Sequence, residues 1–260
     1  GKALQSGTSH NLGQNFAKAF DIRYLDKNGV LQHCWTTSWG LSTRFIGAII
    51  MVHGDDQGLI LPPRLAPYQA VIVPIFKTDD EKSRVLEAAQ CLRAALAAAN
   101  VRTILDEREG ASPGFKFNDW EMRGVPLRIE IGPKDVQKNT VVLARRDKPG
   151  KEGKSFVPQA GIADAVVQAL DAVQKALYAR ALEFRESHTA DPKDYDGFRS
   201  AVENGFAYSF WCGSGECEKR IKEDTKATLR NIPLGQEREA GSCISCGQPA
   251  QERAYFAKAY

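Results

Sequence analysis

The chain has 260 residues, of which 43% are hydrophobic and 26% are charged, and its formal net charge at pH 7 is +3. This is the composition of an ordinary soluble globular protein, with room for one large domain or two to three smaller ones. The net charge is too small to indicate a nucleic-acid partner by itself. No apolar run approaches the roughly 20 residues that span a bilayer, and no secretory signal is present, so we expect a cytoplasmic protein without membrane contacts.

Residues 1–66 form the first expected block. A glycine- and hydroxyl-rich segment, residues 5–10, precedes a helix-like run at 12–19. Segments 21–24 and 30–35 flank a turn composition and predict an antiparallel hairpin. Ser42 and Thr43 then precede the apolar run 45–52, which predicts a helix that is buried because most of its surface is apolar. Pro62 and Pro63 end the block, since adjacent prolines cannot continue a helix.

Arg44 lies at the start of this apolar helix. An arginine at a strand-to-helix junction, beside free backbone N–H groups, suits a phosphate. A buried arginine paired with a carboxylate across a domain boundary fits the same position equally well. The residues alone leave both interpretations open.

Residues 67–186 are predicted to form an α/β domain. The strand candidates are 70–75, 101–105, 127–131 and 140–144, and the first of them is apolar throughout, as in a central parallel strand. The helix candidates are 79–100 and 162–186. The order strand, helix, three strands, helix predicts three layers. A polar and aromatic segment, residues 106–121, is expected as a loop or short helix at a sheet edge.

Residues 187–260 form the third expected block, with helices at 195–204 and 218–228 and strands at 205–211 and 253–260. Two cysteine pairs, Cys212-x4-Cys217 and Cys243-x2-Cys246, fit a tetrahedral structural zinc site in a reducing compartment. Two disulfides or four free thiols are the alternatives. The remaining two cysteines, Cys34 and Cys91, lie among apolar residues and are expected in the core.

No pattern of covalent catalysis is present. The hydroxyl-rich segment before residue 12 is by itself a weak signal, typical of a helix cap. His10, His33, His53 and His188 have no companions that would make a triad. No paired-carboxylate signature and no glycine-rich phosphate loop of the P-loop type occurs.

Three separate blocks resemble one family in its own order. GTSHNLGQNFAKAF (residues 7–20) with TTSWGLSTRFIGAIIMVHGDDQGLILPPRLAP (36–67) resembles the end of the catalytic domain of prolyl-tRNA synthetases, and GLSTR resembles motif 3 of class II synthetases. SPGFKFNDWEMRGVPLRIEIGPKD (112–135) resembles their anticodon-binding domain. The cysteine cluster and final tyrosine resemble their C-terminal zinc-binding domain. The implied fold is the end of a class II antiparallel sheet, a mixed-sheet α/β domain and a small α+β zinc domain.

The resemblance implies ATP-dependent activation of proline, with Mg²⁺, and transfer of proline to tRNA-Pro. It makes Arg44 the catalytic arginine that contacts ATP phosphate. It also implies that Gln5, Thr8 and Ser42 bind ATP, that His10, Trp39 and Gly40 line the proline pocket, and that the Tyr260 carboxylate lies near the active site. No protein nucleophile is needed, since the chemistry depends on positioning and charge stabilisation.

In the second block the resemblance implies anticodon reading by Arg108, Lys116, Arg128 and Glu130. Asp119, Glu121 and Arg145 are further candidates. Arg and Glu side chains can bond unstacked guanine edges, and Phe117 or Trp120 could stack a base. Structural alternatives exist: Trp120 fits a core position, and Glu130 fits an ion pair with Arg128.

Motifs 1 and 2 of the family, which supply the dimer interface and much of the ATP and proline sites, have no counterpart in the chain. We therefore expect a C-terminal piece of a homodimeric enzyme that does not aminoacylate alone, with its first 60 or so residues lacking sheet partners. A free-standing tRNA-binding module is the alternative. A zinc-stabilised α/β scaffold without an RNA role is a third interpretation.

Overall fold

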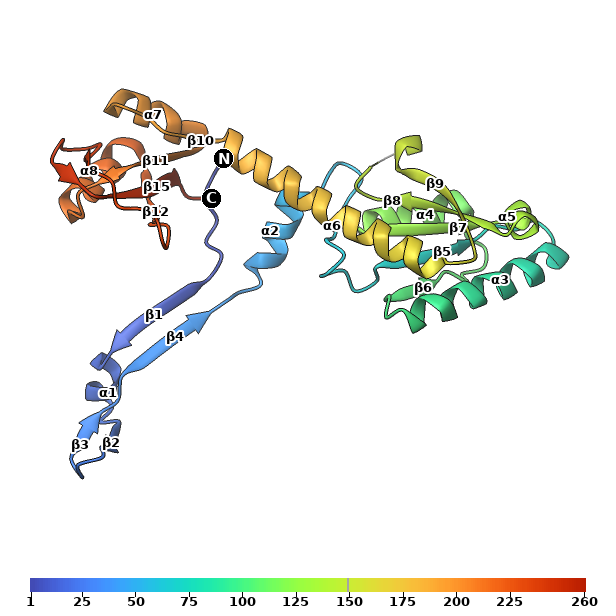
Figure 1. Cartoon of the computed structure of the whole chain (residues 1–260), viewed down its shortest axis with the longest axis horizontal. Coiled ribbons are helices and arrows are strands. Elements are labelled where there is room, and N and C mark those ends of the chain that lie inside the picture. The colour runs from blue at the N-terminus through green and yellow to red at the C-terminus, as the bar shows by residue number, and fades with distance from the viewer. Residues whose placement is uncertain (149) are drawn as a thin grey trace. The chain divides into compact units, whose positions relative to one another are not determined.

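A computed structural model describes residues 1–148 and 150–260 (Figure 1). The chain divides into two compact units, residues 49–184 and residues 1–48 together with 185–260. Across the described residues, no helix has the length and apolar character needed to cross a membrane.

The unit of residues 49–184 is built on a five-stranded mixed sheet in the order β6-β5-β7-β8-β9. The central strand β5 runs parallel to both of its neighbours, whereas β8 is antiparallel to β7 and to β9. The strands are β5 (Ala70–Pro74), β6 (Thr103–Leu105), β7 (Leu127–Ile131), β8 (Thr140–Arg145) and β9 (Lys154–Pro158). The helices are α3 (Asp79–Ala98), α4 (Pro113–Met122), α5 (Pro133–Lys138), α6 (Ile162–Ser187, which continues beyond the unit) and the 3-10 turn η1 (Gly150–Gly153).

Alternation along the strands gives this sheet two different faces, because successive side chains point to opposite sides. One face carries Ile72 and Ile129, and packs with Val85 of α3 and Val166 of α6 in the main core. The other face carries Val71, which packs with residues of α4 in a smaller cluster. The three-layer α/β prediction is therefore confirmed, and the polar segment after β6 contains a ten-residue helix.

The segment after residue 48 packs onto this sheet unit. The Leu59 N–H donates to the Met122 carbonyl at 3.0 Å, and the Leu61 N–H donates to the Gly124 carbonyl at 3.1 Å. Gly124 has a φ of 73°, and a Cβ built there would come within 2.5 Å of the Leu59 Cβ, so glycine is required. Asp55 closes the connection through both carboxylate oxygens, which accept from the Arg146 guanidinium at 2.5 and 2.8 Å.

In the other unit, residues 185–260 form a four-stranded sheet in the order β10-β11-β15-β12. Its strands are β10 (Thr189–Ala190), β11 (Phe206–Trp211), β12 (Ala227–Asn231) and β15 (Glu252–Lys258), with a separate ladder of β13 (Gly241–Ser242) and β14 (Pro249–Ala250). The helices are α7 (Tyr195–Asn204) and α8 (Gly215–Thr225). Phe198 of α7, Ile221 of α8 and Phe256 of β15 are fully buried in a compact core of their own.

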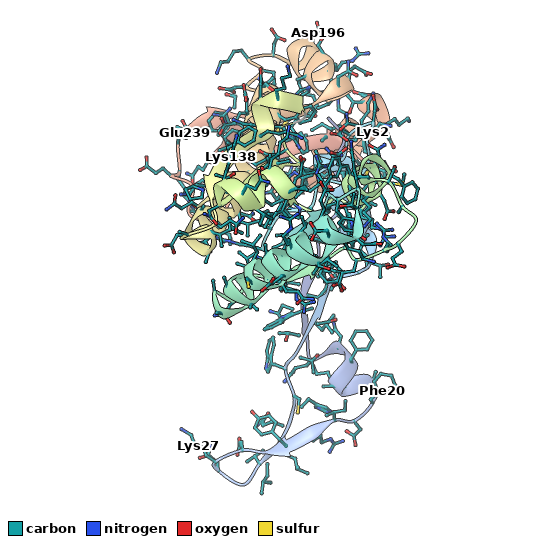
Figure 2. All side chains as sticks on the ribbon, turned by 90° about the vertical axis from the view of Figure 1, so that its right-hand side faces the viewer. Lys2, Phe20, Lys27, Lys138, Asp196 and Glu239 are labelled. Atoms are coloured by element: carbon teal, nitrogen blue, oxygen red, sulfur yellow. The ribbon has the colours of Figure 1, made fainter. Side chains whose placement is uncertain are left out.

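Residues 1–48 form two short antiparallel ladders, β1-β4 and β2-β3. The elements are β1 (Thr8–Gly13), α1 (Asn15–Ala19), β2 (Arg23–Leu25), β3 (Leu31–His33), β4 (Thr36–Gly40) and α2 (Arg44–His53, which continues past residue 48). Within residues 1–48, all of which the structure describes, Ala17 is the one hydrophobic side chain that is buried. Phe20, labelled in Figure 2, is 72% exposed. The predicted hairpin is confirmed, and the predicted helix at 12–19 is shorter because its first residues extend β1.

Two burial predictions are wrong. The helix after Arg44 forms, but no residue of α2 is buried, and Ile46 is 62% exposed. An apolar helix surface implies burial only when a neighbouring element covers it, and here none of the described residues does so fully. The two isolated cysteines are not core residues either, since Cys91 is exposed and Cys34 is half-buried. Cys91 lies on the solvent side of α3, where Leu92 faces the core instead.

Candidate functional sites

The four C-terminal cysteines converge on one point. Cys212 follows the last residue of β11, Cys217 lies in the first turn of α8, and Cys243 and Cys246 lie in the turn between β13 and β14. The Cys212 Sγ is 3.6 Å from that of Cys217 and 3.8 Å from that of Cys246, and all four Sγ atoms lie within 4.8 Å of one another. Zn–S bonds of about 2.3 Å place tetrahedral sulfurs about 3.8 Å apart, whereas a disulfide needs about 2.0 Å. The spacing therefore fits one metal ion and excludes two disulfides.

Backbone contacts hold these cysteine turns in place. Gly213 and Gly247 have φ values of 81° and 72°, which residues other than glycine rarely adopt. The Gly247 N–H donates to the Cys243 carbonyl at 2.8 Å, and the Ile244 N–H donates to the Phe210 carbonyl of β11 at 3.1 Å. The second cysteine pair is thereby fixed against β11, the strand that Cys212 directly follows.

The electrostatics of the cluster suit a cation. Burial acts to raise the pKa of Cys243, but the backbone N–H groups of Cys246 and Ser245 outweigh it and lower that pKa to about 7. Burial and hydrogen bonds within the cluster raise the pKa of Cys217 to about 12. Cys217 and Cys243 are buried, Cys212 is half-buried and Cys246 is exposed. Four thiols this close together need a positive charge among them to become fully thiolate. No free coordination position remains after four sulfur ligands, so a bound zinc would be structural.

The four residues expected to contact ATP line one cavity. Gln5, Thr8, Ser42 and Arg44 surround a space of about 270 Å³. The β1-β4 ladder brings them together, because it pairs Thr8 with Gly40. Arg44 is exposed, and its Nη1 donates to the Gln5 Oε1 at 3.3 Å. Among the described residues it forms no ion pair with a carboxylate. The prediction of a buried Arg44 is therefore wrong, and its guanidinium faces an open polar cavity.

The proline-pocket candidates are only partly brought together. Trp39 and Gly40 line a second, more open cavity with residues 6–9. His10 pairs with Ser38 in the same ladder, next to the register position of Trp39. Among the described residues that line these two cavities, His10 is absent. Trp39 is 81% exposed.

The C-terminal residue lies beside the start of the chain. The Tyr260 N–H donates to the Ala3 carbonyl at 3.0 Å, and the Ala3 N–H donates to the Lys258 carbonyl at 2.9 Å. Ala3 precedes Gln5 by two residues, so the Tyr260 backbone is held close to the segment that lines the Arg44 cavity.

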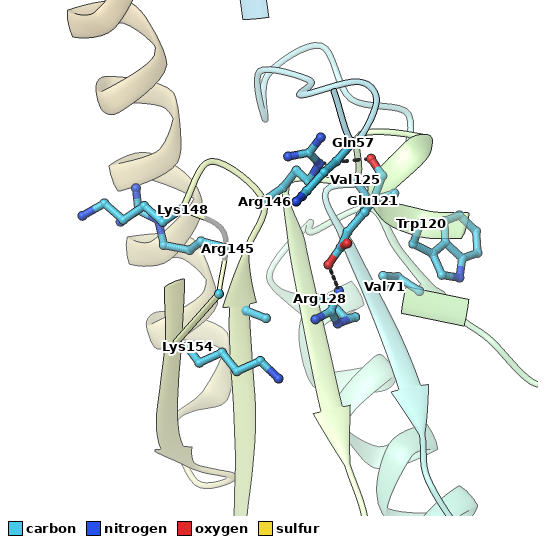
Figure 3. Close-up of a pocket in the computed structure, with 12 residues that line it drawn as sticks. Gln57, Val71, Trp120, Glu121, Val125, Arg128, Arg145, Arg146, Lys148 and Lys154 are labelled. Atoms are coloured by element: carbon cyan, nitrogen blue, oxygen red, sulfur yellow. Dashed lines mark hydrogen bonds and ion pairs between the residues drawn. The ribbon is translucent and has the colours of Figure 1, made fainter. Parts of the chain in front are cut away.

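In the unit of residues 49–184, a cavity of about 200 Å³ opens on the face that α4 covers only in part (Figure 3). Its lining is rich in cationic side chains: Arg128, Arg145, Arg146, Lys148 and Lys154. Arg128 is 9% exposed and bonds two carboxylates, Glu121 at 2.5 Å and Glu130 at 2.9 Å. The predicted Arg128–Glu130 pair is confirmed. The five cations exceed by one the carboxylates that pair with them, which are Glu121, Glu130, Asp147 and Asp55. The face therefore has a small positive excess, which favours a polyanion.

Two predicted anticodon residues lie elsewhere on this unit. Arg108 and Lys116 line a different cavity, of about 290 Å³, at the N-terminus of α3. Both side chains converge on Asp106, whose carboxylate accepts from Arg108 at 2.7 and 3.0 Å and from the Trp120 indole N–H at 2.7 Å. Burial acts to raise the pKa of Asp106, but the bonds from Arg108 and Trp120 hold it well below its ordinary value. Trp120 is 5% exposed, which confirms its prediction as a core residue.

Sequence reasoning missed Lys154, Lys148 and Arg146 in the first cavity. The Lys154 Nζ bonds both oxygens of Glu130, at 2.9 and 3.0 Å. Four of the five residues of β9 are exposed, so the strand carries little sequence signal. Its register places Lys154 on the same face as Arg128, because Lys154 pairs with Ala144 and Ala144 pairs with Arg128. Arg146 carried no local signal, because its partner Asp55 is 91 residues away.

Two family models match the chain. Residues 69–160 match a model described as an anticodon binding domain. This matched range contains the whole five-stranded sheet. Residues 195–260 match a model described as the C-terminal part of prolyl-tRNA synthetase, which contains all four cysteines. The two models therefore cover both charged cavities of the sheet unit and the cysteine cluster.

Curated relatives match the chain over its whole length. A proline–tRNA ligase of Roseiflexus sp. (strain RS-1) is 56% identical over 260 residues, which are 100% of this chain and 54% of the relative. A chloroplastic/mitochondrial proline–tRNA ligase of Arabidopsis thaliana is 51% identical, over 100% of this chain and 48% of the relative. A proline–tRNA ligase of Chlorobium phaeobacteroides is 48% identical, over 100% of this chain and 54% of the relative. The chain thus spans about half the length of these relatives, and it belongs to the prolyl-tRNA synthetase family as a C-terminal portion.

Proposed function

We propose that this chain is the C-terminal part of an enzyme that activates proline with ATP and transfers it to tRNA-Pro. The observation that carries the proposal is the identity with proline–tRNA ligases along the entire chain, at 56% for the Roseiflexus relative. The parent enzyme is a cytoplasmic homodimer that pairs through its N-terminal part. We retain three functional divisions: residues 1–66 as the end of the class II catalytic domain, 67–186 as the anticodon-binding domain and 187–260 as the zinc domain.

In the proposed first step, a proline carboxylate oxygen attacks the α-phosphorus of ATP and pyrophosphate leaves. Arg44 would contact the ATP phosphates with Gln5, Thr8 and Ser42, and the shared cavity of these four side chains supports that role. Mg²⁺ accompanies ATP as a charge-neutralising partner. The arginine donates hydrogen bonds to charge that develops on the phosphates, which is the kind of contact that accelerates the step. His10, Trp39 and Gly40 would line the proline side.

In the second step, a hydroxyl at the tRNA 3′ end attacks the prolyl carbonyl and AMP leaves. Selection of tRNA-Pro would rest on the sheet face that carries Arg128 and Glu130, with Arg108 and Lys116 at the neighbouring cavity. The match of residues 69–160 to an anticodon binding domain supports this assignment. A structural zinc held by the four cysteines would keep β11, α8 and the β13-β14 turn together, and the Tyr260 carboxylate would lie near the active site.

The test is proline-dependent pyrophosphate exchange by the full-length enzyme that carries this chain. Arg44→Ala should lower kcat about 100- to 1,000-fold, as expected when one donor to developing charge is removed. Arg44 is exposed, so its loss should leave the unfolding temperature unchanged. Arg44→Lys should recover only part of the rate, because lysine cannot make the same forked contact.

Lys27→Ala, on the exposed hairpin turn, serves as the matched control and should leave the rate unchanged. Wild-type rates from Arg44→Ala would refute the assigned role. The alternative of a non-catalytic tRNA-binding module is favoured by one feature, since the matched anticodon-binding domain lies complete within residues 49–184. If the full-length protein binds tRNA-Pro but shows no proline-dependent pyrophosphate exchange, that alternative is established.

A further inference from the structure

Phe156 is an exposed aromatic ring on the edge strand of the five-stranded sheet. Its side chain is 76% exposed. Val157, the next residue, packs against the main core on the α3 and α6 side, so Phe156 points to the opposite face. That opposite face is the one that carries the cationic cavity.

Sheet register places Phe156 beside the ion-pair network of that face. Phe156 pairs with Val142 of β8, and Val142 pairs with Glu130 of β7. Lys154, two residues before Phe156 on the same strand and face, bonds Glu130. Neighbouring strands are about 4.8 Å apart, so the Phe156 backbone lies about 10 Å across the sheet from that of Glu130. An exposed ring thus adjoins a charged surface without belonging to it.

Two aromatic residues of this face, Trp120 and Phe117, are already engaged. Trp120 is buried and donates its indole N–H to Asp106. The Phe117 ring lies under the Arg128 guanidinium, 4.0 Å from its centre, with the Lys154 ammonium 5.8 Å away. A base that stacks on Phe117 would share the ring with these cations and with the Val71 cluster, against which the ring packs. The Phe156 ring, by contrast, is exposed.

Exposed aromatic rings interleaved with cations are how proteins hold unpaired nucleotides. Every base has an apolar face that can stack on a ring, whereas the cations bind the phosphates. A single exposed phenylalanine is by itself unremarkable on a protein surface. Here it adjoins a face with a net excess of cations, and the chain region from 69 to 160 matches an anticodon binding domain.

We propose that Phe156 is a stacking platform for an unpaired base of the tRNA anticodon loop. This rests on the proposed function, because it assumes that the sheet face binds tRNA-Pro. The ring contributes affinity through its flat surface, whereas the neighbouring Lys154 acts through its charge. Phe156 therefore adds a binding residue that is outside both charged cavities.

The first test measures the affinity of the chain for a tRNA-Pro transcript by fluorescence anisotropy. Phe156→Ala should weaken binding about 5- to 150-fold, the range found when a base-stacking ring is removed. Phe156→Leu keeps an apolar side chain beside Val142 but offers no ring, so it should bind tRNA-Pro nearly as weakly as Phe156→Ala. Phe156→Trp should bind at least as tightly as wild type. As a control, Tyr178→Ala on α6 removes another exposed ring, which is 67% exposed. This variant should bind tRNA-Pro with wild-type affinity.

The second test separates stacking from charge. The logarithm of the binding constant should fall with the logarithm of salt at the same slope in Phe156→Ala and wild type, whereas Lys154→Ala should flatten the slope by about one. A set of anticodon stem-loops carries 2-aminopurine at a different loop position in each. The stem-loop whose 2-aminopurine stacks on Phe156 should lose fluorescence when it binds wild type. Phe156→Ala should abolish that loss of fluorescence.

Wild-type affinity in Phe156→Ala, or full affinity in Phe156→Leu, would overturn the stacking role while leaving tRNA binding intact. Failure of the wild-type chain to bind tRNA-Pro at all would instead overturn the proposed function of this face.

Discussion

Asp106 is a buried carboxylate that several side chains of the unit of residues 49–184 surround. Its side chain has no exposed surface, and it accepts hydrogen bonds from Arg108 and Trp120 while the Lys116 ammonium lies 3.6 Å away. A buried carboxylate is stable only when such partners compensate its lost hydration. The same carboxylate therefore sets the positions of two predicted anticodon residues.

Asp106→Asn should lower the free energy of unfolding by about 1–3 kcal/mol, since it removes charged hydrogen bonds while keeping the shape. Urea denaturation measures this. Asp80→Asn is a matched control, because Asp80 pairs with Arg84 on the exposed side of α3 and should contribute at most about 0.5 kcal/mol. Equal losses for the two variants would contradict the role of Asp106.

The pH dependence follows from the lowered pKa of Asp106. A carboxylate with a pKa lower in the folded than in the unfolded chain stabilises the fold above the unfolded value, near 4. That stabilisation is lost as pH falls further toward the folded value. The stability of wild type should therefore fall below pH 4 more steeply than that of Asp106→Asn.

Residue-level prediction succeeded where the partners are near in sequence. The Arg128–Glu130 pair lies two residues apart on one strand face, and the cysteine pairs have the spacing of metal-binding turns, so both were visible. The Asp55–Arg146 pair was not visible, because only the fold brings its members together. In the Asp106 cluster, Arg108 is two residues from Asp106 but Trp120 is 14 residues away on α4, and the fold brings that side chain in. The roles of Arg44 and its neighbours remain predictions, although the structure places four of them around one cavity.

At the scale of elements, long periodic segments were predicted well and short ones poorly. The bounds of α7 and β7 match the predicted ranges, and those of α3 and α6 differ by at most two residues. The edge strands β9 and β12 were missed, since each has only five residues and neither shows a regular alternation of buried and exposed positions. For α2, the pattern indicated the helix correctly but not its exposure, which depends on what covers it.

The connection between α2 and the sheet unit gives a prediction at this scale. Asp55 lies two residues after α2 ends, and its partner Arg146 has only 2% of its side chain exposed. Asp55→Ala would leave a buried guanidinium without its counter-charge, which should cost about 3 kcal/mol of unfolding free energy.

Chemical denaturation of the chain, followed by tryptophan fluorescence, checks this cost. Asp56→Ala changes the adjacent, exposed carboxylate and should have little effect. Adding Arg146→Met to Asp55→Ala should recover part of the loss, since no charge then remains buried. A double variant as unstable as Asp55→Ala would show that the charge is not the cause.

At the scale of the whole molecule, the cysteine cluster should make the stability of the C-terminal unit depend on zinc. We expect about one equivalent of zinc by mass spectrometry in protein purified without chelator. Cys246→Ser or a strong chelator should remove the metal and lower the unfolding temperature of this unit, because metal binding contributes directly to folding. Cys91→Ser, at an exposed cysteine outside the cluster, should alter neither value. Metal-free protein of unchanged stability would contradict the assignment.

The exposed apolar side of α2 has a practical consequence for handling this chain in solution. Ile46, Ile50 and Val52 are 62%, 47% and 53% exposed, and Trp35 of the N-terminal ladders is 72% exposed. Ile46 and Ile50 lie one turn apart on α2, and exposed apolar surface of this kind promotes self-association and binds hydrophobic dyes. At high concentration the isolated chain should therefore form reversible aggregates, and Ile46→Glu should improve its solubility without disturbing the separate cores of the sheet and cysteine units.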